Sequence, residues 1–278
     1  MSGNFSSKAG VYVDASNMYR NGGQGMRYDV LREFAHRDGS QILRLNAYVS
    51  IDSDRGTEDQ EYLLNAKKFH SAIRDIGFKV IEKEVRWYQG EDGQRYGKAN
   101  ADFELAIDML LQADNLDKVI LVSGDGDFTK VVNALQNKGC RVEVIALNNT
   151  SSELRREADL FISGFLIPDL VPIKNNPNRI NWGEVGSRVR GVCFSHKQNY
   201  GFMRYLNEVN SELWQTNSQL LNSPYSTAYF KDINLPPRID VSKIPSYNFV
   251  FEFELSKSRE EGKMFEAINI DLHSWVPS

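Results

Sequence analysis

The chain has 278 residues, of which 41% are hydrophobic and 25% charged, and this composition indicates a folded globular protein with room for one large domain or two ordinary ones. The formal net charge of -4 argues against wholesale binding of polyanions, although clustered acids could hide a basic face elsewhere. The first ten residues lack the basic segment followed by an apolar segment that is typical of a secretory signal, and no apolar run is long enough to cross a bilayer. We therefore expect a cytoplasmic protein with no membrane partner.

Residues 10 to about 172 alternate short strand-like runs with runs of helical spacing. Strands are predicted at Gly10–Asp14, Leu43–Ser50, Phe78–Val85, Lys118–Ser123, Arg141–Ala146 and, as a further one, Asp159–Ile162. Helices are predicted at Tyr28–His36, Asp59–Asp75, Ala101–Gln112 and Asp127–Asn137. This alternation predicts an α/β fold in which helices cover both faces of a mostly parallel sheet.

Acidic residues stand where these strands end or where a helix begins. Asp14 closes the first strand and is followed by Asn17, Asp125 and Asp127 follow the fourth strand, and Asp102 opens a helix. Ligands of open α/β sheets bind outside the carboxyl ends of the strands, so the acids are expected to converge on one cleft. Mg²⁺ and Mn²⁺ take carboxylate oxygens, and such ions can activate water and stabilise the leaving oxygen of a phosphodiester. The pattern therefore predicts a metal-dependent phosphodiester hydrolase.

The same acids also have a purely structural interpretation. An aspartate after a strand is often a turn residue or a helix N-cap, and Asp102 and Asp127 suit the N-cap role. Nearby polar residues add to the functional interpretation, because the Asn17 amide could orient a carboxylate or a water and Lys98 could reach a phosphate. Both interpretations stay open at this point.

The segment from Val85 to Lys98 mixes basic and aromatic residues with glycine. Arg86, Trp87 and Lys98 suit a hairpin over the cleft that stacks on bases and touches phosphates. An ordinary exposed hairpin explains the same composition equally well.

Three segments carry a family resemblance: VYVDASNMY, KANADFELAIDML and VILVSGDGDFTKVVNALQNKGCRVEVIAL. Together they resemble the NYN domain family of PIN-like nucleases, in particular its LabA-like branch, over about residues 9 to 168. The resemblance implies a Rossmann-like, PIN-like sheet and a metal-dependent ribonuclease, expected to be an endonuclease using Mg²⁺ or Mn²⁺. It also implies the active-site positions, which are Asp14, Asn17, Asp102, Asp125 and Asp127. One departure is Asn100-Ala101, where family members often have Gly-Val before the central aspartate.

A polar, proline-bounded stretch at residues 173–180 reads as a linker, so we expect one domain at 9–172 and another at 181–278. In the second domain, strand-like aromatic segments occur at Val185–Tyr205, Thr227–Ile233, Phe249–Leu255 and Phe265–Ile270. Helical periodicity is weak except in Glu208–Leu221. This pattern favours a small β-barrel or sandwich.

The order of the aromatic segments resembles a cold-shock domain, an OB-like barrel that binds single-stranded nucleic acid. The matching aromatic positions are Phe194, Tyr200, Phe202, Tyr229 and Phe230, with Lys197 as a phosphate partner. Asn199 and Lys231 depart from the usual glycine and histidine. A binding face requires exposed rings at Tyr200, Phe202 and Phe230, whereas aromatic alternation in a strand is otherwise typical of a core.

The sequence thus favours a metal-dependent ribonuclease acting on single-stranded RNA, with the barrel holding the strand. The alternatives are a non-catalytic RNA-binding regulatory adaptor and a nuclease for single-stranded DNA. Single-stranded RNA is the expected partner, and a homodimer is the oligomer considered.

Overall fold

The computed structural model describes residues 6–89, 93–174, 180–259, 262 and 264–275, and for residues 96–98 it describes the backbone alone. The chain divides into two compact units, Met1–Gln24 with Leu31–Ile162 and Gly25–Val30 with Ser163–Ser278. Residues 175–179, most of the expected linker at 173–180, lie outside the described residues. Within the part that the structure describes, none of the helices combines the length and the apolar character that crossing a membrane requires.

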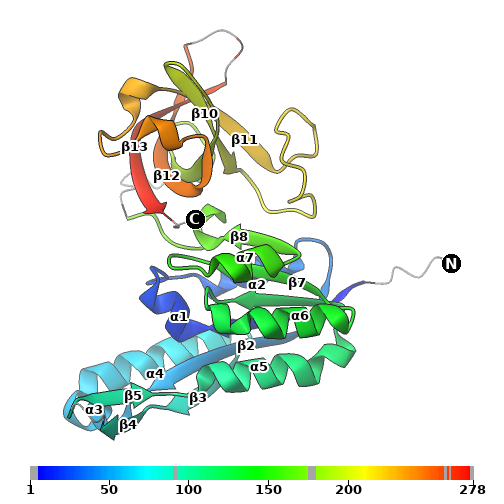
Figure 1. Ribbon diagram of the computed structural model, residues 1–278, viewed down its shortest axis with the longest axis vertical. Coiled ribbons are helices and arrows are strands. Elements are labelled where there is room, and N and C mark those ends of the chain that lie inside the picture. The colour runs from blue at the N-terminus through cyan, green and yellow to red at the C-terminus, as the bar shows by residue number, and fades with distance from the viewer. Residues whose placement is uncertain (1–5, 90–92, 175–179, 260–261, 263, 276–278) are drawn as a thin grey trace, which may run out of the picture. The chain divides into compact units, whose positions relative to one another are not determined.

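The first unit is built on a six-stranded sheet in the order β3-β2-β1-β6-β7-β8 (Figure 1). Its strands are β1 (Lys8–Asp14), β2 (Gln41–Ile51), β3 (Lys79–Glu84), β6 (Lys118–Val122), β7 (Arg141–Ala146) and β8 (Leu160–Ser163). The pairs β1–β2, β2–β3, β1–β6 and β6–β7 are all parallel. The chain first builds outward from β1 to β3 and then outward from β6 to β8, so the strand order reverses between β1 and β6.

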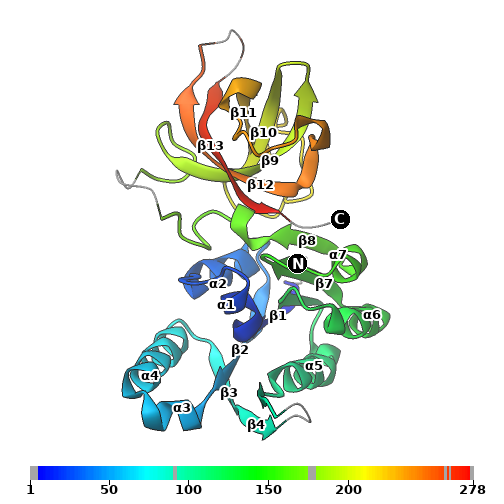
Figure 2. The same ribbon diagram turned by 60° about the vertical axis from the view of Figure 1, so that its left-hand side comes forward.

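Helices cover both faces of this sheet, as the sequence predicts. They are α1 (Ala15–Arg20), α2 (Tyr28–His36), α3 (Ser53–Glu58), α4 (Gln60–Asp75), α5 (Ala101–Gln112), α6 (Thr129–Asn137) and α7 (Ser152–Glu157). Figure 2 shows α1, α2 and α4 on one side of the sheet and α5 and α6 on the other. Leu105 and Met109, one turn apart on α5, are fully buried in the same core cluster as Val132 of α6.

Local chemistry explains where these elements begin and end. β6 is buried along its whole length and is an unbroken apolar run after Lys118, as expected for a central parallel strand. Gly77 follows α4 with φ of 104°, a left-handed conformation that favours glycine where a helix stops. At the starting edge of the sheet, the buried charges have partners: Lys118 Nζ lies 2.6 Å from Oδ2 of the partly exposed Asp38, and Arg37 Nη2 lies 2.6 Å from Glu143 Oε2.

Between β3 and α5 the chain forms an antiparallel hairpin of β4 (Arg86–Gln89) and β5 (Arg95–Lys98). The predicted hairpin is therefore confirmed. A short 3-10 helix, η1 (Ala113–Asn115), extends α5, and another, η2 (Gly126–Phe128), precedes α6.

The second unit contains a closed barrel with the strand order β10-β11-β13-β12-β9 (Figure 1). The strands are β9 (Arg188–Lys197), β10 (Tyr200–Leu206), β11 (Tyr225–Lys231), β12 (Ser246–Lys257) and β13 (Phe265–Trp275). The β11–β13 pair is parallel and the other neighbouring pairs are antiparallel. The described residues of this unit also form the 3-10 helices η3 (Gly164–Leu166), η4 (Asp232–Asn234) and η5 (Val241–Lys243).

Two features of this unit qualify the sequence-based picture. The helix suggested for Glu208–Leu221 is wrong, because this segment consists of turns and irregular backbone. Asparagine side chains accept backbone N–H groups two residues ahead, as Asn210 Oδ1 does from Glu212, and such local turns compete with a helix. Residues 163–172 pack with the barrel, since the buried Arg190 guanidinium donates to the carbonyl oxygens of Val171 at 2.7 Å and Pro172 at 3.2 Å.

Candidate active site and nucleic-acid interface

Asp14 lies at the carboxyl end of β1, where the strand order reverses. Its side chain is only 2% exposed. Oδ1 accepts the backbone N–H of Asn17 at 2.9 Å and so caps α1, while Oδ2 accepts the hydroxyl of Ser123, just past β6, at 3.3 Å. The carboxylate is thus held from both strands that border the reversal, which is where ligands bind in open α/β sheets.

The SGDGD loop after β6 is tied to the same place. Asn17 Oδ1 accepts the Gly124 N–H at 3.1 Å, which links α1 to the loop. Asp125 Oδ1 accepts the Asp127 N–H at 3.0 Å and caps η2. Gly126 has no space for a side chain, because an added Cβ would lie 2.9 Å from Ser151 Oγ. Asn17 therefore holds the loop in place through this hydrogen bond. Its contact with a carboxylate or a water stays a prediction.

The structural interpretation of Asp102 and Asp127 as helix caps is wrong. Asn100 occupies the N-cap position of α5, so Asp102 stands inside the first turn. Asp127 lies inside η2, whose cap is Asp125. Of the four candidate acids, the two that cap a helix are Asp14, which ends β1, and Asp125, three residues after the end of β6. Capping therefore does not account for the side chains of Asp102 and Asp127.

The acids interact electrostatically. Burial raises the pKa of Asp14 to about 6, and the charge of Asp102 adds to the rise, while the Asn17 N–H, the Ser123 hydroxyl and Arg20 oppose it. Burial also raises the pKa of Asp102, with further contributions from the charges of Asp125 and Asp127. Asp102 thus disfavours the ionisation of Asp14, and Asp125 and Asp127 disfavour that of Asp102, so a cation would relieve this repulsion.

The starting edge of the sheet offers a contrast. Burial alone would raise the pKa of Asp38, but hydrogen bonds from the Lys118 ammonium and from Ser40 hold it at about 2. Asp14 is more deeply buried, and its two hydrogen-bond donors are neutral. The protein compensates the partly exposed carboxylate of Asp38 with a cation of its own and leaves the buried carboxylate of Asp14 without such a direct partner.

The donor chemistry at the carboxyl ends of the strands, where Asp14 lies, fits Mg²⁺ or Mn²⁺. Within the described parts of the chain, no group of three or more histidine, cysteine, aspartate or glutamate side chains is arranged to hold an ion as it stands. Mg²⁺, however, usually takes one or two carboxylates and keeps several waters, so a preformed cage is not required. The oxygen-only donor set also matches hard cations rather than zinc.

In the absence of metal, Asp14 is expected to make the free energy of unfolding depend on pH. Its pKa of about 6 lies above its ordinary value of 3.8, so the folded chain holds this proton more tightly than the unfolded chain. The stabilisation is full below about pH 4 and is lost as the pH rises to about 6, by up to about 3 kcal/mol. Urea unfolding in EDTA across this range measures the change. The variant Asp14→Asn should lack this part of the pH dependence, and an unaltered profile would contradict the assignment.

The hairpin beside α5 presents two of the predicted nucleic-acid contacts on its surface. Arg86 and Trp87 are exposed, and the Trp87 indole N–H donates to Asp52 Oδ1 at 3.3 Å. The Arg95 guanidinium lies 5.4 Å from the centre of the Trp87 ring. The side chain of Lys98, the third predicted contact, lies outside the described residues. Binding by this hairpin stays a prediction.

On the barrel, four of the predicted aromatic residues form one connected patch across β9, β10 and β11. Tyr200 and Phe202 alternate along β10, and their ring centres are 6.1 Å apart. Tyr229 of β11 lies 5.6 Å from Tyr200 and 5.9 Å from Phe202, and Phe194 of β9 lies 6.4 Å from Phe202. These residues are partly exposed except Tyr229, which is 7% exposed. We call Phe194, Tyr200, Phe202 and Tyr229 the aromatic patch.

The expectation that Phe230 belongs to this patch is wrong. Phe230 is fully buried in the barrel core with Phe251 and Phe253. Successive side chains of a strand point to opposite faces, so Tyr229 and Phe230 cannot both face outward. Lys197 is exposed at the end of β9, with Nζ 5.9 Å from the centre of the Tyr200 ring, and its phosphate contact stays a prediction.

Sequence reasoning missed Arg204, two residues beyond Phe202 on the same face of β10. Its guanidinium carbon lies 5.2, 5.5 and 5.3 Å from the ring centres of Phe194, Tyr225 and Tyr247. Nη2 donates to the Tyr247 hydroxyl at 2.9 Å. The period-two alternation of a strand could have placed this cation beside the aromatic patch.

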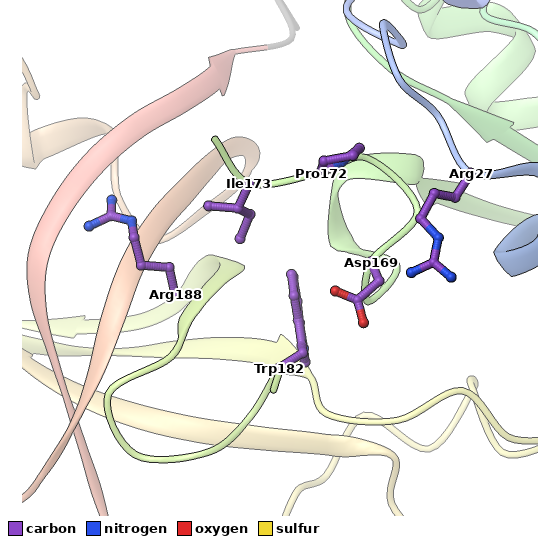
Figure 3. Close-up of a pocket in the computed structure, with 6 residues that line it drawn as sticks. All are labelled: Arg27, Asp169, Pro172, Ile173, Trp182 and Arg188. Atoms are coloured by element: carbon purple, nitrogen blue, oxygen red, sulfur yellow. The ribbon is translucent and has the colours of Figure 1, made fainter. Parts of the chain in front are cut away.

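A separate pocket of about 180 Å³ in the second unit carries no predicted site residue. It is lined by Arg27, Asp169, Pro172, Ile173, Trp182 and Arg188. Figure 3 shows the two arginines on opposite sides, with Trp182 and Asp169 between them. Arg27 Nη2 lies 2.5 Å from Asp29, and Arg188 pairs with Glu252 and Asp271, so both cations already have carboxylate partners.

Comparison with known proteins places residues 8–169 in the family model described as the NYN domain. The low amplitude and bright protein LabA of Synechococcus elongatus is 29% identical over 163 residues, which are 56% of this chain and 83% of that protein. A crystal structure of a protein of unknown function from Vibrio parahaemolyticus is 27% identical, with a TM-score of 0.47, over 59% of this chain and 96% of that one. Phosphofructokinase-2 of Escherichia coli is 19% identical, with a TM-score of 0.25, over 55% of this chain and 54% of that one.

Proposed function

The chain belongs to the NYN domain family, and from this premise we propose that it is a metal-dependent ribonuclease that hydrolyses phosphodiester bonds of single-stranded RNA, with the C-terminal barrel holding the strand. The matched region covers the whole parallel sheet and every acid of the candidate site. The preference for RNA over single-stranded DNA rests on the family resemblance.

One observation carries the proposal: a buried aspartate, Asp14, lies at the strand-order reversal, and burial together with the charge of Asp102 raises its pKa to about 6. Buried carboxylates normally have a partner, because an unpaired buried charge is costly. Asp14 repels Asp102, which in turn feels Asp125 and Asp127. This arrangement is unfavourable for folding alone and becomes favourable with a divalent cation.

Asp14, Asp102, Asp125 and Asp127 would hold the ion, and we place Mg²⁺ or Mn²⁺ there. When bound, such an ion supplies an activated water and stabilises charge on the leaving oxygen. The chain's own contribution is to position the donors. The Asn17 amide fixes the loop at Gly124, and the Ser123 hydroxyl fixes the Asp14 carboxylate. Arg86, Trp87 and Lys98 on the hairpin would contact the strand near these acids.

The barrel is proposed to be an OB-like module. Its order, with β9-β10-β11 consecutive and β13 inserted parallel between β11 and β12, supports a Greek-key barrel of that kind. The second and third strands of OB-folds provide the binding face, and here these are β10 and β11. Stacking of a base on the aromatic patch contributes roughly 1–3 kcal/mol with little sequence preference, and Lys197 would contact a phosphate.

A cleavage assay tests this function directly. Fluorescent single-stranded RNA should be cut in Mg²⁺ or Mn²⁺, and EDTA should stop cleavage, because the acids need the ion to activate water. Single-stranded DNA of the same sequence is the matched substrate, and more rapid cleavage of DNA would contradict the RNA assignment. Products from the interior of a substrate blocked at both ends would establish endonucleolytic action.

A second candidate is an RNA-binding adaptor that does not cut. It is favoured by the finding that, among the described side chains, no set of three potential ligands is arranged for an ion. The adaptor predicts RNA binding that survives EDTA and no cleavage with either metal. The same assay, run with a binding measurement, separates the two candidates.

A further inference from the structure

A pocket of about 380 Å³ adjoins the aromatic patch on the barrel. It is lined by Asn199, Tyr200, Tyr229, Lys231, Asp232 and Ile233. Tyr200 pairs with Lys231 across β10 and β11, so the pocket lies at one end of this strand pair, where η4 begins. Its size is at the lower end of the range for small-molecule sites. The proposed function gives no role to Asp232 or Ile233.

The walls of this pocket suit a planar ring. The Tyr200 and Tyr229 rings lie 5.6 Å apart at an angle of 46°, which gives two aromatic surfaces at its edge. Ile233 is 89% exposed although it is a large apolar residue. A base stacked on a tyrosine could cover part of the Ile233 side chain, and both contacts would gain from burial.

The polar groups of the pocket are held in place. His196 Nε2 lies 2.8 Å from Asp232 Oδ1, and the His196 ring stacks on the buried Phe230 at 6.2 Å and 17°. The Asp232 N–H also donates to the Asn199 carbonyl oxygen at 3.0 Å. The core of the barrel therefore fixes the Asp232 carboxylate through His196, and Lys231 lines the same pocket.

A carboxylate only accepts hydrogen bonds and an ammonium only donates them, so this pair selects for a particular base edge. Guanine carries an acceptor, O6, beside two adjacent donors, N1–H and the 2-amino group. Uracil flanks its one N–H with two oxygens, which the carboxylate would repel, while adenine and cytosine have a ring-nitrogen acceptor beside their amino group. Guanine alone offers the carboxylate two neighbouring donors and the ammonium an acceptor.

We propose that this pocket is a guanine-selecting subsite, in which Asp232 accepts from N1–H and the 2-amino group, Lys231 donates to O6, and the base stacks on Tyr200. His196 acts as a positioning residue. This inference rests on the proposed function, because it takes single-stranded RNA as the ligand of the barrel. It adds a base preference to a surface whose stacking contacts are otherwise indifferent to sequence.

The test uses fluorescence anisotropy with the full chain carrying Asp14→Asn, in EDTA, so that the RNA stays intact. The probes are octauridine and the same oligomer with one central guanosine, adenosine, cytidine or inosine. Guanosine should tighten binding about tenfold over uridine, as expected for a good bidentate base contact. Inosine keeps O6 and N1–H and lacks the 2-amino group, so it should recover only part of this gain. This comparison needs no change in the pocket itself.

In the protein, Asp232→Asn replaces an acceptor oxygen with a donor amide and should abolish the guanosine preference. Its affinity for octauridine should not fall, because the carboxylate that repels the uracil oxygens is gone. Glu208→Gln, the same change at an exposed position in the loop after β10, is the control and should keep the preference. Equal affinity for all probes, or a preference that persists in Asp232→Asn, would overturn the guanine subsite and leave the proposed function intact. If the full chain carrying only Asp14→Asn bound none of the probes, the proposed function itself would be contradicted.

Discussion

Replacing Asp14 with asparagine is expected to slow cleavage of single-stranded RNA about a thousandfold while changing RNA affinity by less than about twofold. Metal assistance supplies several kcal/mol of transition-state stabilisation, and each 1.36 kcal/mol is a factor of ten in rate. The variant removes one charged ligand from the proposed set. It leaves the aromatic patch and the hairpin unchanged, so binding should persist. Single-turnover cleavage in Mn²⁺ and anisotropy in EDTA measure the two quantities.

Asparagine is the informative substitution because it keeps the local structure. Asp14 caps α1 through its contact with the Asn17 N–H, and asparagine is as good an N-cap as aspartate. The amide can also face the Ser123 hydroxyl. The variant should therefore fold, and in EDTA above about pH 6 it should be more stable than the parent, since it no longer buries a charge. A loss of activity together with a gain in stability would be difficult to explain by misfolding.

Asp125→Asn should lower cleavage in the same way, because it removes another of the proposed ligands. Asp125 caps η2, and asparagine preserves that cap, so the variant should fold. Asp114→Asn is the matched control. Asp114 is exposed in η1, beyond the last turn of α5, and pairs with Lys138 Nζ at 2.6 Å. The control should cut at the parental rate. Full activity in both Asp14→Asn and Asp125→Asn would refute the metal-dependent mechanism.

The sheet and its helices could be predicted because their signals are local. The bounds predicted for Tyr28–His36, Ala101–Gln112 and Arg141–Ala146 are those of α2, α5 and β7. The two central strands, β1 and β6, are apolar between their ends, as expected where both faces of a sheet are covered. A glycine with positive φ stops α4, and that residue type is itself visible in the sequence.

Which aspartate caps a helix could not be predicted, because the first turn of α5 begins before Asp102, at Ala101. Sequence spacing leaves the first residue of the helix uncertain by one or two positions. That offset decides whether the Asp102 carboxylate caps the helix or belongs to the candidate site. The mutual repulsion among the acids also depends on β1 lying beside β6, a pairing between segments more than 100 residues apart. Such effects arise from tertiary structure.

The barrel shows a different kind of limit. The resemblance to a cold-shock domain transfers residue positions from a motif. It assigns both Tyr229 and Phe230 to a binding face. The pleat of β11 allows only one of two adjacent residues there, and Phe230 turns inward. The same alternation places Arg204 beside Phe202, although no motif drew attention to it. Strand parity would have corrected both assignments once the strand bounds were known.

Phe230→Ala and Phe202→Ala are expected to have opposite consequences. Phe230 is fully buried, so its truncation leaves a cavity and should lower the free energy of unfolding of the barrel by about 3–5 kcal/mol. Phe202 is partly exposed in the aromatic patch, so its truncation should cost little stability and weaken RNA binding by roughly 1–3 kcal/mol. The two phenylalanines lie on the neighbouring strands β10 and β11 and occupy opposite faces of the barrel wall.

Because the chain has two units, unfolding must be followed in the barrel alone. The chain has four tryptophans, and in a Trp87→Phe background those remaining, Trp182, Trp214 and Trp275, all lie in the second unit. Their fluorescence during urea unfolding then reports the barrel, and anisotropy with RNA in EDTA reports binding. If Phe202→Ala destabilised the barrel as much as Phe230→Ala without weakening RNA binding, the aromatic patch would be a second core rather than an interface. A stable barrel with weakened binding in Phe202→Ala would instead support stacking on the outer face as the way the strand is held.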